Sequence, residues 1–230
     1  DLHRYGQVLA HRNALLRKMN GRGSGQMRFW NRELARSGAR ILAKRMRLTA
    51  GIGQDLERLY RELSGEDAPL RLEYRSGVDF SPESDEESIL FAFREAMRRV
   101  WKRELELGRT LVGPHRDDLA FLLGEMDLAV YGSRGQQRTA AAALKLAEAE
   151  WRMRKDGDPP VVLLDDVLSE LDAQRRGFLQ SWLLRMPPGQ QAVVTASDAG
   201  LLHPLVLAQA HVYHIRAGQW CPAVHSEGAG

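Results

Sequence analysis

The stretch that decides the fold is Val161-Val162-Leu163-Leu164-Asp165-Asp166, four apolar residues followed by two acids. A short apolar run of this kind indicates a strand buried in the middle of a sheet. Ligands of α/β proteins bind at the carboxyl ends of such strands, so we expect both carboxylates at that edge. There, one carboxylate can hold Mg²⁺ and the other can orient or deprotonate a water that attacks a phosphate. An Asp pair that only caps the following turn is the alternative.

Strands and helices alternate on both sides of this stretch. The pattern predicts an Ala-rich helix before it and helices and strands after it, at residues 136–154, 173–184, 192–195, 201–208 and 211–215. Further upstream, residues 118–123 and 126–131 are predicted to pair as a hairpin around Gly124-Glu125. This alternation indicates a layered α/β domain.

The loop before the Ala-rich helix has the sequence Tyr131-Gly132-Ser133-Arg134-Gly135-Gln136-Gln137-Arg138-Thr139. Its glycines permit a close approach of the backbone to a ligand, and Ser133 can cap the helix or donate to a phosphate oxygen. The free N–H groups at the helix start favour an anion. Many loops before helices share these features, so the loop gains meaning only together with the acidic strand end.

Two further motifs complete the pattern, Leu168–Asp172 (LSELD) and Thr195–Asp198 (TASD). In this order and spacing, the motifs resemble those of the ATP-binding-cassette ATPases of the SMC and RecF group. SRGQQRT resembles their signature motif, VVLLDD the Walker B strand, LSELD the D-loop and TASD the switch region.

Within that group the chain resembles the RecF family of bacterial DNA-repair proteins. The resemblance covers nearly the whole chain and lies in four runs: YGQVLAHRNALLR (5–17), GPHRDDL (113–119), YGSRGQQRTAAAALKLAEAE (131–150) and DDVLSELDAQRR (165–176). It implies an α/β fold, the P-loop NTPase lobe of an ABC-type ATPase preceded by a mostly helical, coiled-coil-like arm. We expect the arm at residues 1–109 and the lobe, the C-terminal part of the head, at residues 110–230.

The resemblance also implies roles for single residues. Those implied to bind the ATP held by a partner head are Ser133, Arg134, Gly135 and Gln136. Asp165 would bind Mg²⁺, and Asp166, where many cassette ATPases carry Glu, would be the general base. Asp172 would lie in the D-loop at the dimer interface. Either Thr195 or Ser197 would occupy the switch position.

The loop that cradles the ATP phosphates in cis, G-x-x-x-x-G-K-[ST], does not occur in the 230 residues. We therefore expect the chain to be the C-terminal portion of a longer protein. By resemblance, it would be a weak ATPase only when completed by the lobe that carries this loop and when dimerised, and inactive alone.

The first third of the chain is predicted to be helical and is strongly basic. Residues 1–63 carry 14 Lys or Arg against 5 Asp or Glu, although the whole chain has a net charge of only +3. Helices are expected at 2–19 and 28–63, separated by a glycine-rich break, and the second could kink at Gly51 and Gly53. A strand at 70–74 and a helix at 88–107, ended by Gly108, follow.

Five cations recur every four residues along the second helix: Arg28, Arg32, Arg36, Arg40 and Lys44. This spacing places them on one side of the helix, where they could contact successive phosphates of DNA. A solvated helix face is the alternative. A second polar group, residues 115–118 (HRDD), offers no secure mechanism, and a structural salt-bridge cluster is an equal interpretation.

The resemblance implies an ATP-driven homodimer that recognises gapped or junction DNA and helps to load recombinase through RecR and RecO. A single cysteine, Cys221, excludes an internal disulfide and is typical of the cytoplasm, and no apolar run is long enough for a membrane span. One alternative is a non-catalytic DNA- or protein-binding module with a basic arm. Another is a metal-dependent phosphohydrolase that uses Asp165, Asp166 and Asp172.

Overall fold

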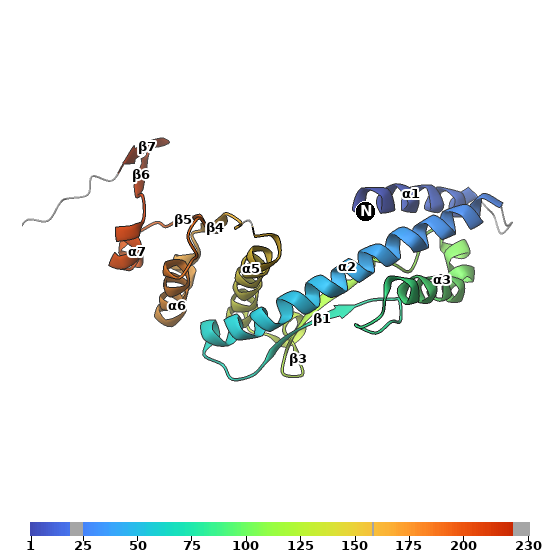
Figure 1. Ribbon diagram of the computed structural model, residues 1–230, viewed down its shortest axis with the longest axis horizontal. Coiled ribbons are helices and arrows are strands. Elements are labelled where there is room, and N and C mark those ends of the chain that lie inside the picture. The colour runs from blue at the N-terminus through green and yellow to red at the C-terminus, as the bar shows by residue number, and fades with distance from the viewer. Residues whose placement is uncertain (19–24, 158, 223–230) are drawn as a thin grey trace, which may run out of the picture.

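A 40-residue helix, α2 (Gly25–Ser64), runs along most of the computed structural model, which describes residues 1–18, 25–157 and 159–222. Helices α1 (Leu2–Lys18) and α3 (Glu86–Leu107) lie along its N-terminal half, as Figure 1 shows. All three helices were predicted from their apolar periodicity. Residues 19–24, which include most of the predicted glycine-rich break, lie outside the described residues.

The three helices of this arm enclose their own core. The side chains that fill it are buried and come from all three helices and the loop after α3; they include Tyr5, Leu34, Ile41, Phe93 and Val112. Asp85 caps the start of α3 by accepting a hydrogen bond from the Ser88 N–H, and Gly108 ends the helix with a positive φ of 62°.

An ion pair is fully buried among these helices. The Arg12 guanidinium donates to Glu104 at 2.5 Å, and both side chains have 0% exposure. Arg12 also donates to Asn31 at 2.7 Å and to the Thr110 hydroxyl at 2.6 Å. A buried charge is tolerated only when its hydrogen-bonding groups are satisfied, and this network satisfies them.

A three-stranded antiparallel sheet follows, in the order β1 (Leu70–Arg75), β2 (Asp118–Leu123) and β3 (Met126–Asp127). The predicted hairpin turn at Gly124-Glu125 is confirmed, but the strand expected over 126–131 is wrong beyond Asp127. Residues Leu128–Tyr131 form the short helix α4 instead. The reason is local, because the Asp127 carboxylate accepts from the Ala129 N–H and so caps a helix rather than continuing a strand.

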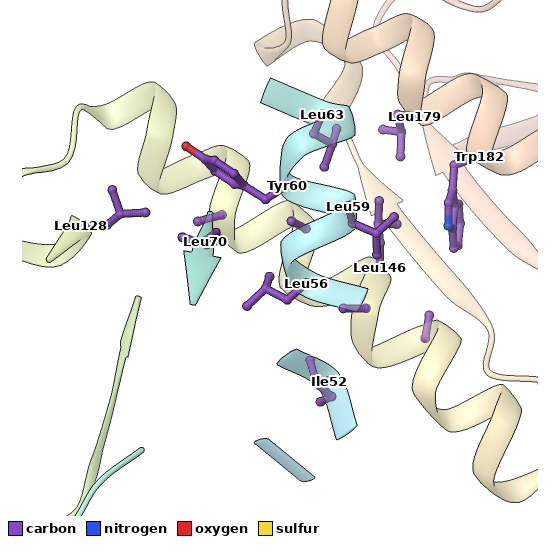
Figure 2. Close-up of a cluster of buried hydrophobic side chains, with 14 of the residues drawn as sticks. Ile52, Leu56, Leu59, Tyr60, Leu63, Leu70, Leu128, Leu146, Leu179 and Trp182 are labelled. Atoms are coloured by element: carbon purple, nitrogen blue, oxygen red, sulfur yellow. The ribbon is translucent and has the colours of Figure 1, made fainter. Parts of the chain in front are cut away.

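The lobe consists of α5 (Arg134–Asp156), β4 (Val162–Asp165), α6 (Ala173–Leu184) and β5 (Ala192–Thr195). Strands β4 and β5 are parallel, with Asp165 opposite Thr195. The C-terminal half of α2 packs against α5 and α6, and Figure 2 shows Leu59 of α2 with Leu146 of α5 and Trp182 of α6. The second core of the molecule lies here.

The expectation that the apolar run before Asp165 is a strand buried in the middle of a sheet is wrong for β4 in the described residues. One face packs on the lobe core through alternate residues such as Val162 and Val194. On the other face Leu163 is 72% exposed and Val193 is 51% exposed. Within residues 1–18, 25–157 and 159–222, nothing covers that face.

The last elements are smaller. A 3-10 turn, η1 (Val167–Glu170), follows β4, and η2 (Ala199–Leu201) follows β5. Helix α7 (Pro204–Gln209) then leads to a hairpin of β6 (Tyr213–Arg216) and β7 (Gln219–Pro222). The sequence predicted the first hairpin strand and missed the second. Ala217 and Gly218 both have positive φ, the backbone that a two-residue hairpin turn needs.

The division of the chain at residue 109 stays a prediction. Strand β1 precedes that position and pairs over its whole length with β2, which follows it. The core around Leu59 likewise combines residues from both sides of position 109. The arm and the lobe are therefore continuous through α2 and through this sheet.

Candidate functional site

The carboxyl ends of β4 and β5 bring three of the predicted site residues together. The Thr195 hydroxyl donates to the Asp165 carboxylate at 2.6 Å and accepts from the Asp166 N–H at 2.9 Å. Thr195 thus links the Asp165 carboxylate to the Asp166 backbone, whereas Ser197, the other candidate for the switch position, lies exposed two residues further on. The parallel register of the strands makes this meeting possible.

Asp166 has an unusual backbone conformation. Its φ is 49° and its ψ is 23°, in the left-handed region that Asp tolerates better than most residues. Its carboxylate makes no capping hydrogen bond to η1, although the residue directly precedes that turn. The alternative in which this acid only caps the next turn therefore does not describe Asp166, and its carboxylate faces solvent.

The edge of the sheet that carries Asp165 and Asp166, called the acidic edge below, fits a Mg²⁺ ion that is shared with a bound phosphate. Carboxylate oxygens are the hard ligands that Mg²⁺ prefers, and Mg²⁺ usually takes one or two of them while keeping waters and phosphate oxygens. In the described part of the chain, no group of three or more His, Cys, Asp or Glu side chains could hold a metal. Asp165, Asp166 and Asp172 therefore do not form the three-carboxylate site of a metal-dependent phosphohydrolase.

The predicted signature residues form the start of α5. Ser133 is the N-cap, and its hydroxyl oxygen accepts from the Gln136 N–H at 3.2 Å. In return, the Gln136 carboxamide oxygen accepts from the Ser133 N–H at 3.0 Å, which completes a capping box. The Ser133 hydroxyl keeps its own proton for donation, because it acts only as an acceptor in this box.

Glycines leave room for a ligand at this helix start. A Cβ atom on Gly135 would meet only the Ser133 Oγ, at 3.9 Å, so the space above the backbone is open. Gly132 is needed for another reason, because a Cβ there would lie 2.6 Å from the Leu128 carbonyl oxygen. Ser133, Arg134 and Gly135 are all exposed. The arrangement presents N–H groups, a hydroxyl and a cation to solvent at the positive end of a helix.

Asp172 has a structural role in the predicted D-loop. Its carboxylate accepts from the Arg175 N–H at 2.9 Å and from the Arg175 guanidinium at 2.8 Å, which caps α6. One ion pair links this segment to the signature helix, from Arg138 to Glu170 at 3.4 Å. The cap fixes the direction in which α6 leaves the acidic edge.

Reasoning from the sequence did not single out one residue of this region, Glu66. Glu66, just after the end of α2, lies within 3.3 Å of the Gln136 side-chain nitrogen. No motif or periodicity marks Glu66, because it is one of two adjacent acids in a short polar loop. Only the packing of α2 against α5 brings it to the signature residues.

The five predicted DNA-contacting cations are all exposed on α2. Three of them form surface ion pairs: Arg36 with Glu33 at 3.8 Å, Arg40 with Glu86 at 3.2 Å, and Lys44 with Asp1 at 2.6 Å. Such exposed pairs contribute little to stability, so the cations can exchange these partners for phosphates. The Arg32 guanidinium lies 5.9 Å from the centre of the Phe29 ring.

The HRDD group at residues 115–118 is a structural cluster in this fold. The Tyr74 hydroxyl donates to Asp117 at 2.6 Å, and Tyr5 lies 2.8 Å from His115. Arg45 of α2 donates to the Pro114 carbonyl oxygen at 2.6 Å. Burial lowers the pKa of His115 and raises that of Tyr5 above its ordinary value. These contacts tie α1, α2 and β1 to the segment that leads into β2.

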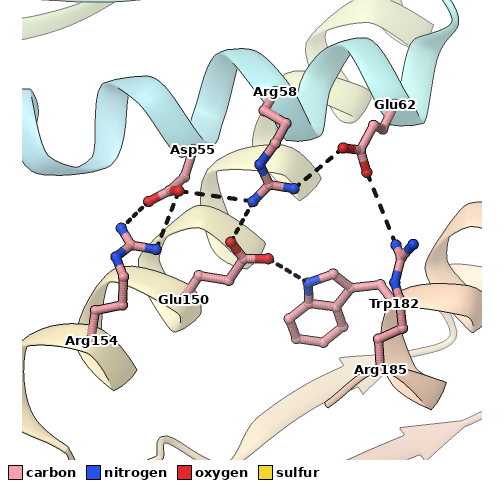
Figure 3. Close-up of polar contacts among 7 residues, drawn as sticks. All are labelled: Asp55, Arg58, Glu62, Glu150, Arg154, Trp182 and Arg185. Carbon is pink, nitrogen blue, oxygen red and sulfur yellow. Dashed lines mark hydrogen bonds and ion pairs between the residues drawn. The ribbon is translucent and has the colours of Figure 1, made fainter. Parts of the chain in front are cut away.

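A network of alternating charges joins α2, α5 and α6 (Figure 3). Arg58 of α2 donates to Glu150 of α5 at 2.5 Å, and Glu150 also accepts from the Trp182 indole of α6 at 3.0 Å. Burial acts to lower the pKa of Arg58, but the charges of Glu150, Glu62 and Asp55 and the hydrogen bond to Glu62 together raise it above its ordinary value. Arg154 pairs with Asp55 at the same interface. These contacts hold the arm helix against the two helices that begin at the signature motif and the D-loop.

Comparison with known proteins finds similar proteins named RecF. No family model matches the chain. A RecF protein of Herpetosiphon aurantiacus is 43% identical over 226 residues and covers 96% of this chain, and one of Roseiflexus castenholzii is 40% identical over 229 residues. The chain is a RecF homologue. It spans 56% and 58% of the length of these two RecF proteins.

Solved RecF structures share the fold. A structure of the recombination mediator protein RecF-ATPrS in the RecFOR pathway superposes with a TM-score of 0.81 at 30% identity, over 97% of this chain and 58% of its own. A RecF-ATP structure gives a TM-score of 0.75 at 32% identity, over 86% and 52%. The predicted ABC-type lobe with a preceding helical arm is thereby confirmed. In the described residues, every helix is too short or too polar to span a membrane.

Proposed function

We propose that the chain supplies the arm and part of the ATPase head of a RecF protein that acts in recombinational DNA repair in the cytoplasm. In this proposal, two heads dimerise around ATP, and the dimer binds gapped or junction DNA and works with RecR and RecO to load recombinase. Support comes from the RecF homologues and from the RecF structures described with ATP and within the RecFOR pathway.

The start of α5 is the observation that carries the proposal. An exposed serine hydroxyl, free to donate, lies beside an uncovered glycine backbone at a helix N-terminus. An anionic group is the ligand that such a helix start favours. Ser133, Arg134, Gly135 and Gln136 would contact the terminal phosphate of the ATP bound by the partner head, which makes ATP the link between the two protomers.

The acidic edge would act on the ATP bound by its own head, whereas the signature residues would contact the ATP of the partner head. Asp165 would hold Mg²⁺, which when bound neutralises charge on phosphate oxygens. Asp166, solvent-facing and without a cap bond, would accept the proton of the attacking water. Thr195, which contacts the Asp165 carboxylate and the Asp166 backbone N–H, would sense the state of the nucleotide. The activity would be a weak ATPase that needs a cis phosphate cradle outside these 230 residues.

Ser133→Arg in the full-length natural protein tests the proposal. The longer side chain would fill the space that the phosphate needs, so ATP should no longer shift the mass in solution from monomer to dimer. Ser181→Arg, at an exposed serine of α6, is the matched control and should dimerise normally. Before this test, the intact mass of the natural protein is measured and the coding sequence upstream of Asp1 is read. An ATP-dependent dimer that persists in Ser133→Arg removes the signature assignment.

A further inference from the structure

The end of α2 lies between the two helices that begin at the site. Gly65, with φ +70°, turns the chain directly after the helix, and a Cβ on Gly65 would lie 2.6 Å from the Gln174 side chain in the first turn of α6. The next residue, Glu66, contacts Gln136 in the first turn of α5. One short turn therefore contacts both the signature helix and the D-loop helix.

Glu66 is held in place at this turn. Its N–H donates to the Ser64 hydroxyl at 3.0 Å, and its carboxylate accepts from the Tyr60 hydroxyl at 3.4 Å. The Tyr60 side chain is fully buried, and burial, with the nearby Glu66 charge, raises the pKa of Tyr60 to about 12. The Tyr60 hydroxyl thus keeps its proton at neutral pH and remains a donor to Glu66.

The Gln136 carboxamide is engaged at both of its ends. Its oxygen accepts from the Ser133 N–H at 3.0 Å, and its nitrogen donates to the two Glu66 oxygens at 3.3 and 3.5 Å. The Gln136 N–H in turn holds the Ser133 hydroxyl oxygen at 3.2 Å. A chain of hydrogen bonds therefore runs from Glu66 to the hydroxyl that the proposed function assigns to the ATP phosphate.

We propose that Glu66 is a positioning residue for the signature motif. It fixes the Gln136 carboxamide and, through the capping box, the direction of the Ser133 hydroxyl. Because only Gly65 separates Glu66 from the end of α2, the helix that carries the basic row ends two residues before the residue that orients the signature. This inference rests on the proposed function, since it assumes that the signature binds ATP of a partner head.

Glu66 could also act in the opposite direction, by electrostatic repulsion of the bound phosphate. A carboxylate beside an anion site repels a phosphate, and removal of its charge would then favour ATP binding. Gln and Ala substitutions separate the two effects, because Gln keeps an acceptor oxygen and loses the charge, while Ala loses both. Positioning predicts that Gln preserves function and Ala impairs it. Repulsion predicts that both substitutions improve it.

The test measures, in the full-length natural protein, the ATP concentration at half-maximal dimerisation. We expect Glu66→Ala to raise it about tenfold, the effect of losing one hydrogen bond to a charged group. Glu66→Gln should stay within about twofold of wild type for the reason just given. The matched control is Asp67→Ala, which removes the neighbouring exposed carboxylate and should change nothing. ATP binding by the monomer should be equal in all four proteins, and the melting temperature without nucleotide should be equal in wild type, Glu66→Gln and Asp67→Ala.

Each other pattern overturns the inference. Normal dimerisation by Glu66→Ala, or equal defects in the Gln and Ala variants, would exclude positioning through the acceptor oxygen. Dimerisation at lower ATP in both would establish repulsion instead. If Glu66→Ala melts early, Glu66→Gln alone decides, because a defect there contradicts the inference. Failure of Ser133→Arg to block dimerisation overturns the proposed function as well, whereas a block with normal Glu66 variants overturns this inference alone.

Discussion

Acids that look equivalent in the sequence differ at the level of single side chains. Asp166 and Asp172 lie only six residues apart, and the resemblance implies that Asp166 is the general base and that Asp172 lies in the D-loop at the dimer interface. In the fold, Asp172 caps α6 and pairs with Arg175, whereas Asp166 makes no capping bond and takes a left-handed backbone. A strained backbone next to a reactive edge is consistent with a functional role.

Asp166→Asn should retain ATP binding and lose hydrolysis in the full-length protein. Asn tolerates the left-handed backbone as Asp does, so the loop should keep its shape. The loss of a general base lowers the turnover rate by about 10² to 10⁴-fold. Single-turnover hydrolysis and equilibrium ATP binding, measured side by side with Asp67→Asn as the control, separate the two effects. Wild-type turnover would exclude Asp166 as the base.

Residue-level prediction from the sequence depended on whether a residue belonged to a motif. The signature, acidic and switch residues were named from their motifs, and the structure brings Asp165, Asp166 and Thr195 into contact. Arg12 was not singled out, although it interrupts the apolar positions Val8 and Leu16 on one face of α1. That interruption was the available signal for its buried pair with Glu104. Glu66 carried no signal, because its contact depends on how two distant helices pack.

At the level of elements, periodicity predicted the long helices and failed on short segments. The helices α2, α3, α5 and α6 occur close to their expected ranges, because their buried stripes extend over many turns. Segment 128–131 was predicted as strand and forms α4, and β7 was missed. Four residues hold too few repeats for a period, so a single cap or turn decides their structure.

Replacement by alanine of the two glycines in the middle of α2, Gly51 and Gly53, should have opposite effects on stability. The helix continues through both, and the kink expected there does not interrupt it. A Cβ on Gly51 would overlap the Trp151 ring of α5, whereas a Cβ on Gly53 would meet nothing within 4 Å. Gly51→Ala should therefore lower the melting temperature by forcing α2 away from α5. Gly53→Ala should raise the free energy of unfolding by about 0.5 to 1 kcal/mol.

Thermal and urea unfolding of both variants beside wild type is the measurement. Since the substitutions are identical and two residues apart on one helix, their difference isolates the close approach of α2 to α5. Equal stabilisation by both would mean that Trp151 can move aside at no cost.

At the scale of the whole molecule, α2 contributes fully buried side chains to both large hydrophobic cores of the described chain. Its N-terminal half contributes Leu34 and Ile41 to the arm core, and its C-terminal half contributes Leu56 and Leu59 to the lobe core. The sequence indicated the arm and the lobe, and the RecF comparison confirms that fold. The sequence pattern could not indicate that the second half of α2 belongs to the lobe, because the apolar residues of α2 recur with the same helical period along its whole length.

Reversal of the basic row should weaken DNA binding in a salt-dependent way. Arg32, Arg36 and Arg40 changed together to Glu should lower affinity and reduce the slope of log affinity against log salt, by about 0.9 for each phosphate that the protein no longer neutralises. The control reverses three exposed arginines elsewhere, each paired with a carboxylate as Arg36 and Arg40 are: Arg61, Arg71 and Arg152. Both variants change net charge equally, so a difference in slope is local to the row. Equal slopes would assign the row to a solvated face.

The pairing of β1 with β2 has a consequence for any attempt to study the arm by truncation. A fragment that ends at residue 109 would keep β1 and lose β2, leaving the edge of a strand open along its whole length. The same cut would strip α5 and α6 from the second half of α2 and expose Leu56, Leu59 and Leu63 to water. An open edge beside an apolar helix face promotes self-association. Fragments produced for crystallisation or binding assays should therefore retain the sheet and α5, or the aggregation of the exposed faces will be measured instead of the arm.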